Sequence, residues 1–223
     1  MALDPDTSDD GVRDRLIEGV TPTDSHDEPA SGDAIHDEPV GVTHPARKGG
    51  HVTDVPAVAA RLTLTDERLV VCDADSDLAD CEIRFADIVY VREGQQEING
   101  NAAECLSIRH INPPANAVTT KLRLWDDAAH DRLTAVVTDF YRQRRAAIDE
   151  LELSTPQLKT LEAAYSAGRE FDPATLLSES TEDIAALFGP LRRADLLRTG
   201  DTGVFLTGLG HMVVSERVDD ERM

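Results

Sequence analysis

Aromatic residues, cysteines and long apolar runs are scarce in this sequence of 223 residues. No apolar run approaches the roughly 18 residues that a membrane-spanning helix needs, and the first residues lack the basic and apolar regions of a signal peptide. Cys72, Cys81 and Cys105 are odd in number and stand nine and 24 residues apart, which fits neither a disulfide framework nor a C-x-x-C metal site. We therefore expect a cytoplasmic protein whose cysteines are small buried hydrophobic residues.

Positive charge is also in short supply. The chain has 43 acidic residues against 22 basic ones, for a formal net charge of -21, and only Lys48, Lys121 and Lys159 are lysines. In about 1 M salt the Debye length falls to roughly 3 Å, so the self-repulsion of such a surface is screened. The composition favours a salt-loving microbe. An ordinary acidic protein is the alternative, although the excess charge is not confined to one stretch.

Residues 1–50 are rich in Asp, Pro, Gly, Ser and Thr, a composition typical of disorder, and we expect a disordered acidic arm there. Within it, His26-Asp27-Glu28 is echoed ten residues later by His36-Asp37-Glu38. Histidines and carboxylates in register could bind a metal ion weakly, but nothing there fixes a coordination geometry. We expect a duplicated stretch of solvated linker and no metal site.

From residue 51 the apolar residues recur at every second position, which predicts strands. The strand candidates are 60–64, 68–72, 81–85, 88–91, 106–110 and 119–125. The pattern then becomes helical, with Asp126 or Asp127 as the N-cap and an apolar stripe that reaches Leu151. Several antiparallel strands followed by one amphipathic helix predict a pleckstrin-homology-like β-barrel over residues 51–153, and hence an α+β chain.

Residues 154–223 have the pattern of a winged-helix domain. Ser154 caps a first helix, Asp172 opens a short second helix and Thr181 caps a third. Two short apolar runs then flank the glycine-bearing turn 200–203, which is typical of a hairpin and would be the wing. A last helix closes the domain.

The search for catalytic motifs gives no candidate. The sequence contains no G-x-G-x-x-G, P-loop, H-E-x-x-H or G-x-S-x-G motif. We therefore expect no catalytic residue, no cofactor and no metal, and a protein that works by binding other proteins.

A winged-helix domain also suggests nucleic-acid binding as a function, in which its third helix would enter the major groove. Here that helix begins with two acidic residues and carries Arg192 and Arg193 only near its end. We expect Gly189-Pro190 to interrupt it, because proline lacks the N–H that a helical turn needs. A groove-reading helix normally has clustered Lys and Arg. We therefore do not expect the chain to bind nucleic acid, and a haloarchaeal winged-helix transcription regulator stays the alternative.

Three segments carry a resemblance to a known family: residues 44–54 (His-Pro-Ala-Arg-Lys-Gly-Gly-His-Val-Thr-Asp), Arg61-Leu62-Thr63-Leu64, and residues 153–168 with Ala164-Tyr165-Ser166-Ala167-Gly168. Together they resemble the archaeal taxis protein CheF family over about residues 44–215, most specifically in the C-terminal segment. Because residues 1–43 are too polar to fold, we expect a shortened paralogue of that family.

The resemblance implies an adaptor that couples the phosphorylated response regulator CheY to the motor switch of the archaellum. Its partners would be CheY and archaellum switch proteins, with no membrane insertion. The candidate partner-binding residues are Arg192 and Arg193, because guanidinium groups fork onto carboxylates and we expect both on the exposed side of the third helix. A stand-alone interaction module outside taxis is a further alternative.

Overall fold

The computed structural model describes residues 35–72, 81–98, 101–112, 116–167, 172, 181–201 and 203–220. These residues fall within one compact unit, Asp33–Met223. The strands are β1 (Glu38–Lys48), β2 (His51–Val52), β3 (Val58–Leu64), β4 (Arg68–Cys72), β5 (Cys81–Arg84), β6 (Ile88–Ile98), β7 (Asn101–Asn112), β8 (Asn116–Leu124), β9 (Leu197–Thr199) and β10 (Val204–Leu206). The helices are η1 (Phe85–Asp87, a 3-10 turn), α1 (Asp127–Asp149), α2 (Thr155–Ala167), α4 (Thr181–Arg193) and α5 (Gly208–Asp220).

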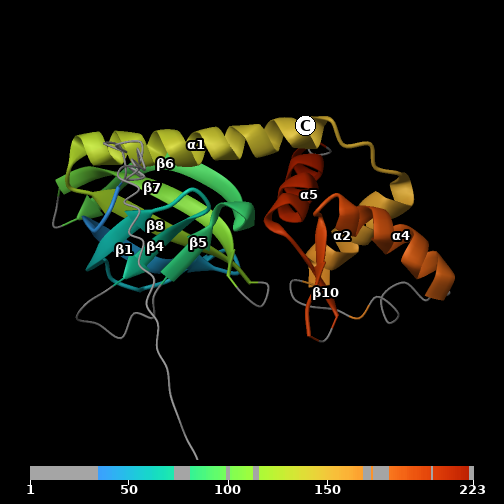
Figure 1. The fold of residues 1–223 in the computed structure, drawn as a ribbon. Coiled ribbons are helices and arrows are strands. Elements are labelled where there is room, and N and C mark those ends of the chain that lie inside the picture. Colours follow the sequence, from blue (N-terminus) through green and yellow to red (C-terminus); the bar gives the residue numbers. More distant parts are fainter. Residues whose placement is uncertain are drawn as a thin grey trace, which may run out of the picture. The chain divides into compact units, whose positions relative to one another are not determined.

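Eight strands form one curled antiparallel sheet (Figure 1). Their order is β5-β4-β3-β1-β8-β7-β6, with β2 paired to β1. All six strand candidates from the sequence lie in or overlap these strands, because alternating apolar residues place one face of each strand in the core. The predicted α+β class is confirmed in the form of a half-barrel with C-terminal helices. The pleckstrin-homology-like and winged-helix assignments, and the domain boundary at residue 153, stay predictions.

The disordered arm predicted for residues 1–50 is wrong from residue 35 onward. β1 pairs with β3 on one side and β8 on the other, which makes it a central strand of the sheet. Ile35, Val40 and Val42 belong to its buried core, with exposed fractions of at most 2%. The composition of this segment did not predict a strand, because polar residues of this kind are typical of disorder. The strand forms because β3 and β8, which come later in the chain, pair with it. The rest of the predicted arm, residues 1–34, lies outside the described residues.

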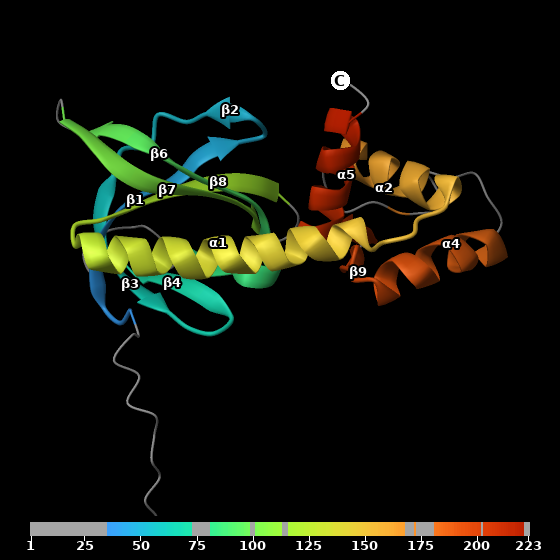
Figure 2. The ribbon, with the colours of Figure 1, turned by 90° about the horizontal axis from the view of Figure 1, so that it is seen from above.

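Helix α1 closes the core of the half-barrel. Asp126 caps it as predicted, with its Oδ1 accepting a hydrogen bond of 2.7 Å from the Ala129 amide. Leu133 and Val137 are fully buried against the sheet. Figure 2 shows α1 running along the curled sheet toward α5. The helix contacts both β6 and α5.

The C-terminal elements pack around a second apolar cluster, which also contains Val89 and Ile111 from the sheet. The predicted hairpin is present as β9 and β10, paired antiparallel. The predicted interruption at Gly189-Pro190 is wrong: α4 continues to Arg193 through Pro190. Proline removes one helical N–H, but its own carbonyl still accepts a hydrogen bond of 2.9 Å from the Ala194 amide, so helical bonding resumes beyond it. The short second helix predicted after Asp172 lies outside the described residues.

Two of the three cysteines behave as predicted. Cys81 and Cys105 are buried, whereas Cys72 is exposed at the end of β4, so the prediction is wrong for that residue. Among the described helices, none has the length and apolarity that crossing a bilayer requires.

Candidate protein-binding surfaces

A buried carboxylate joins the C-terminal hairpin to the sheet. Asp87, on η1, is only 5% exposed. Its Oδ2 lies 2.6 Å from Nη2 of Arg84, and its Oδ1 lies 3.7 Å from Nη1 of Arg198 on β9. Gly208, the first residue of α5, packs so close to η1 that a Cβ there would come within 2.7 Å of the Ala86 carbonyl oxygen. These contacts hold β9 and the first residue of α5 against η1, next to β6.

The juxtaposition of β6, α1 and α5 creates a groove of about 270 Å³, which we call the tyrosine groove. Tyr90 and Tyr141 meet edge to face in it, with ring centroids 6.1 Å apart. Nε of Arg145 on α1 lies 2.8 Å from Oε1 of Glu216 on α5 and ties the two helices together. The groove is lined by Val89, Tyr90, Arg109, Tyr141, Arg145, Met212, Ser215 and Glu216.

The chemistry of the tyrosine groove suits recognition of another protein. Tyrosine and arginine are enriched at interface hot spots, since they combine a large apolar contact area with hydrogen-bond donors. Tyr90 is 48% exposed and available to a partner. Burial raises the pKa of Tyr141, which the Arg145 charge opposes and the Glu216 charge reinforces. Its hydroxyl therefore stays protonated at neutral pH and can donate a hydrogen bond.

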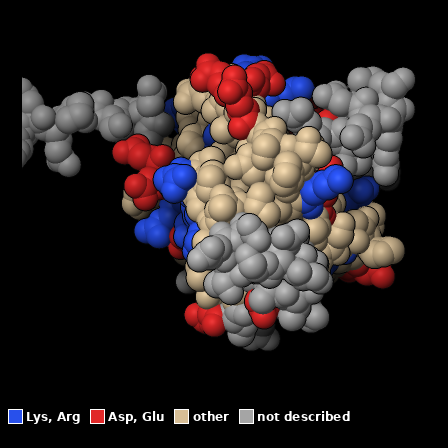
Figure 3. Space-filling model, turned by 90° about the vertical axis from the view of Figure 1, so that its right-hand side faces the viewer, with Lys and Arg blue, Asp and Glu red and all other residues tan. Residues whose placement is uncertain are grey.

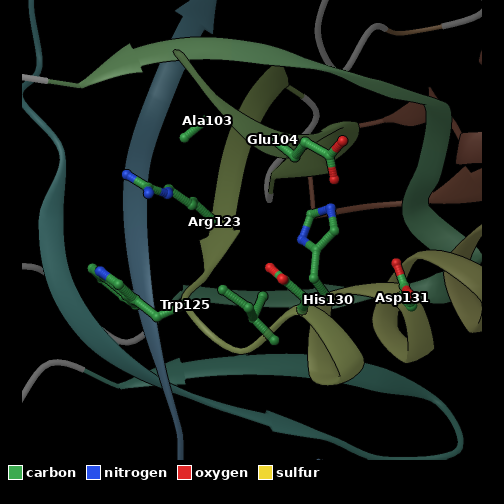
Figure 4. Close-up of a pocket in the computed structure, with 8 residues that line it drawn as sticks. Ala103, Glu104, Arg123, Trp125, His130 and Asp131 are labelled. Carbon is green, nitrogen blue, oxygen red and sulfur yellow. The ribbon is translucent and has the colours of Figure 1, made fainter. Parts of the chain in front are cut away.

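A second pocket, of about 350 Å³, lies at the start of α1 (Figure 4). We call it the barrel-end pocket; it is lined by Ala103, Glu104, Arg123, Leu124, Trp125, Asp127, His130 and Asp131. The His130 ring points toward Glu104 in Figure 4. Trp125 is 54% exposed, and its indole lies so close over Gly41 that a Cβ there would be 3.2 Å from it. The pocket combines charged groups with one exposed aromatic ring.

The sequence-predicted residues Arg192 and Arg193 lie elsewhere. Both are exposed in the last turn of α4, and Nη1 of Arg192 donates to Oγ1 of Thr199 at 3.4 Å. Neither lines the tyrosine groove. Figure 3 views the side that carries the C-terminal helices, where basic side chains gather at two borders of an uncharged central region. The role of Arg192 and Arg193 in partner binding stays a prediction.

One cluster inside the half-barrel offers metal-ligand atoms, from His44, Cys81 and His110. Burial lowers the pKa of His44, and it lowers that of His110 to about 4 with the neighbouring His44 acting in the same direction. Burial also raises the thiol pKa of Cys81 to about 11, against an opposing hydrogen bond with Thr120. At neutral pH both imidazoles are therefore uncharged and the thiol is protonated.

Sequence reasoning missed both the tyrosine groove and this cluster. Tyr90 was predicted only as part of a strand and Tyr141 only as part of a helical stripe. The 50 residues that separate Tyr90 from Tyr141 in the sequence carry no signal that the two rings meet. His44 and His110 are also far apart in the sequence, so their spacing matches no metal-binding motif.

The comparisons with known proteins agree on one family. Residues 31–143 match the model of the family described as "Archaeal Chemotaxis signal transduction system protein F". The chain is 28% identical over 186 residues to Taxis protein CheF2 of Halobacterium salinarum, a match that covers 83% of this chain and 63% of that protein. It is 24% identical over 184 residues to Taxis protein CheF1 of the same organism, covering 81% of this chain and 61% of that protein.

The chain thus spans less than two thirds of the length of these two relatives. The family match contains β1 through most of α1, and so includes Tyr90, Arg109 and Tyr141 of the tyrosine groove. It ends before Arg192 and Arg193, and before the segment 153–168, where we expected the resemblance to be most specific. Since the family model covers half of the chain, this protein belongs to the archaeal CheF family of chemotaxis signal transduction proteins.

Proposed function

We propose that this chain is a non-catalytic adaptor of archaeal chemotaxis, which couples the phosphorylated response regulator CheY to the archaellum motor switch by protein–protein binding. Membership of a chemotaxis signalling family supports the pathway. An adaptor transmits a signal by forming and releasing interfaces, and it needs neither a cofactor nor a nucleic acid.

The observation that carries the proposal is the tyrosine groove. Two tyrosines and two arginines converge on a concave surface at the junction of β6, α1 and α5. A few desolvated aromatic and arginine anchors usually provide most of the binding energy of an interface, and charged rims set its rate and specificity. Tyr90 is the anchor we assign to this surface.

An adaptor needs a second surface for its second partner, and we assign that role to the exposed turn with Arg192 and Arg193. In this proposal residues 51–153, joined by β1, form a pleckstrin-homology-like barrel and residues 154–223 form a winged-helix domain. The tyrosine groove then lies at the junction of the two domains, so a partner that binds in the groove affects both of them.

A pulldown in molar KCl tests the proposal. The bait is the full chain, or a version that begins at Asp33, because a version that begins at His44 would lose half of the central strand β1. The prey is CheY in both phosphorylation states, and separately the archaellum switch proteins. We expect both baits to retain phosphorylated CheY and a switch protein. Failure of both baits to retain any taxis or archaellum protein would end the adaptor proposal.

Matched substitutions locate the surface. We expect Tyr90→Ala to weaken capture of one partner about tenfold or more, which is a typical hot-spot loss. Trp125→Ala is the control, because it removes an aromatic residue of similar exposure from the barrel-end pocket. Loss of binding with Trp125→Ala but not with Tyr90→Ala would move the site to that pocket. Arg192→Glu combined with Arg193→Glu should weaken capture of the other partner and leave the circular dichroism spectrum unchanged.

A haloarchaeal winged-helix transcription regulator is the second candidate. The β9–β10 hairpin after α4 favours it, because a helix followed by a wing is the arrangement that winged-helix proteins place on DNA. Only Arg192 and Arg193 add positive charge in the last turn of α4. Chromatin immunoprecipitation decides: sharp, reproducible peaks at promoters would favour the regulator over the adaptor.

A further inference from the structure

Three strands that are distant in sequence bring a thiol and two imidazoles together inside the half-barrel. Cys81 on β5 and His110 on β7 are 5% and 2% exposed, and His44 on β1 is half-buried. Their ligand atoms all lie within 4.8 Å of one another. The two imidazole rings stack with centroids 5.8 Å apart and an interplanar angle of 21°.

A threonine hydroxyl connects the three groups. Oγ1 of Thr120, on β8 and fully buried, lies 2.7 Å from Nδ1 of His44 and 2.9 Å from Nε2 of His110. It also forms a hydrogen bond with the thiol of Cys81. A hydroxyl has one hydrogen to donate and two lone pairs, so all three contacts together use its full capacity. The three groups thus converge on the Thr120 hydroxyl, and an ion bound among them replaces that hydroxyl as the partner of both imidazole nitrogens.

The distances within the cluster come close to those of a metal site. Three atoms that lie within 4.8 Å of one another always have a common point within about 2.8 Å of each. Zinc binds imidazole nitrogen at about 2.0–2.1 Å and thiolate sulfur at about 2.3 Å. Each ligand atom therefore needs to move inward by at most about 0.5–0.8 Å.

The donor set selects the class of ion. Thiolate and imidazole are the ligands of zinc and neighbouring transition metals, whereas calcium and magnesium take oxygen ligands. The half-buried position of His44 provides the route by which an ion enters from solvent. On binding, the thiol of Cys81 gives up its proton to solvent as the sulfur–metal bond forms.

We propose that His44, Cys81 and His110 form a site for a zinc-class divalent cation, which ties β1, β5 and β7 of the half-barrel together. Thr120 keeps its hydrogen bond to Cys81 and so orients the thiolate, as a neighbour of the ligands commonly does in metal sites. The proposed metal site is independent of the proposed adaptor function. It gives the half-barrel a metal-dependent stability.

Zn²⁺ alone and Co²⁺ alone are the probes. The full chain is stripped with EDTA, freed of chelator and titrated calorimetrically in molar KCl. We expect one Zn²⁺ per chain, and with Co²⁺ a thiolate-to-metal charge-transfer band in the near ultraviolet. At free Zn²⁺ a hundredfold above Kd, the unfolding equilibrium constant should fall by about 100-fold by mass action.

Matched variants assign the site. We expect Cys81→Ser and His110→Gln each to lower zinc affinity by at least about tenfold, since even neighbours of metal ligands have effects of that size. Cys72→Ser, at an exposed cysteine, and His130→Gln, at the barrel-end pocket, should leave the affinity unchanged.

Two results would overturn the proposal. One is the lack of saturable binding of either ion; the other is unchanged affinity in both Cys81→Ser and His110→Gln. The cluster is then a hydrogen-bonded polar part of the core. If either ligand variant does not fold, the cobalt spectrum of the parent and of Cys72→Ser decides, and a spectrum without the charge-transfer band at saturating Co²⁺ also overturns the site.

Discussion

The close approach of α5 to η1 leads to a quantitative prediction for Gly208. A Cβ at this position would lie 2.7 Å from the Ala86 carbonyl oxygen, and 2.8 Å and 3.0 Å from backbone carbons of Asp87. None of these atoms is the end of a flexible side chain, so α5 or η1 must move by about 0.5–1 Å to restore ordinary contact. Overpacking of this kind costs about 1–3 kcal/mol.

The substitution Gly208→Ala should therefore destabilise the protein by about 1–3 kcal/mol, measured by urea unfolding in molar KCl. Gly94→Ala is the matched control, because a Cβ at Gly94 would meet open space within 4 Å. It should be neutral or stabilising by up to about 1 kcal/mol, since alanine restricts the unfolded chain. Because α5 forms one wall of the tyrosine groove, Gly208→Ala should also weaken partner capture. Equal stability of Gly208→Ala and the parent would refute the reasoning.

Three further predictions concern charge. Asp87→Asn should lower the free energy of unfolding by about 1–3 kcal/mol, because it leaves Arg84 and Arg198 without their buried carboxylate. The control Asp139→Asn breaks an exposed pair at 3.6 Å and should cost less than about 0.5 kcal/mol. Similar urea midpoints for the two variants would contradict this prediction. Burial, aided by the Arg109 charge, lowers the pKa of His211 to about 4, so stability should be full above about pH 6.5 and fall toward pH 4, where only the unfolded state takes up the proton. His211→Gln should flatten that decline in urea unfolding, and an unchanged slope would argue against it. Circular dichroism against KCl concentration should show a native fold in molar salt that loosens in dilute buffer, where screening fails; full stability at about 50 mM salt would disprove the halophilic interpretation.

The sequence by itself determined the elements whose signal is local. Alternating apolar residues predicted the strand candidates now found in β3 to β8, and the three- and four-residue steps after Asp126 predicted α1 with its cap. The glycine-bearing turn predicted the β9–β10 hairpin. The family was also accessible, because short segments carry its pattern. In each case the information lies within a stretch that one strand, turn or helix occupies.

Only the tertiary structure decided the place of β1 and the composition of the sites. β1 is a central strand because β3 and β8 pair with both of its edges, and its own composition predicts disorder. Likewise, α4 continues through Pro190, whose carbonyl still accepts a hydrogen bond from the Ala194 amide. Tyr90 meets Tyr141, and Cys81 meets His44 and His110, only after the sheet has curled. Periodicity fixes which face of a strand is buried, whereas strand order and curvature fix which buried residues become neighbours, and these depend on contacts across the whole chain.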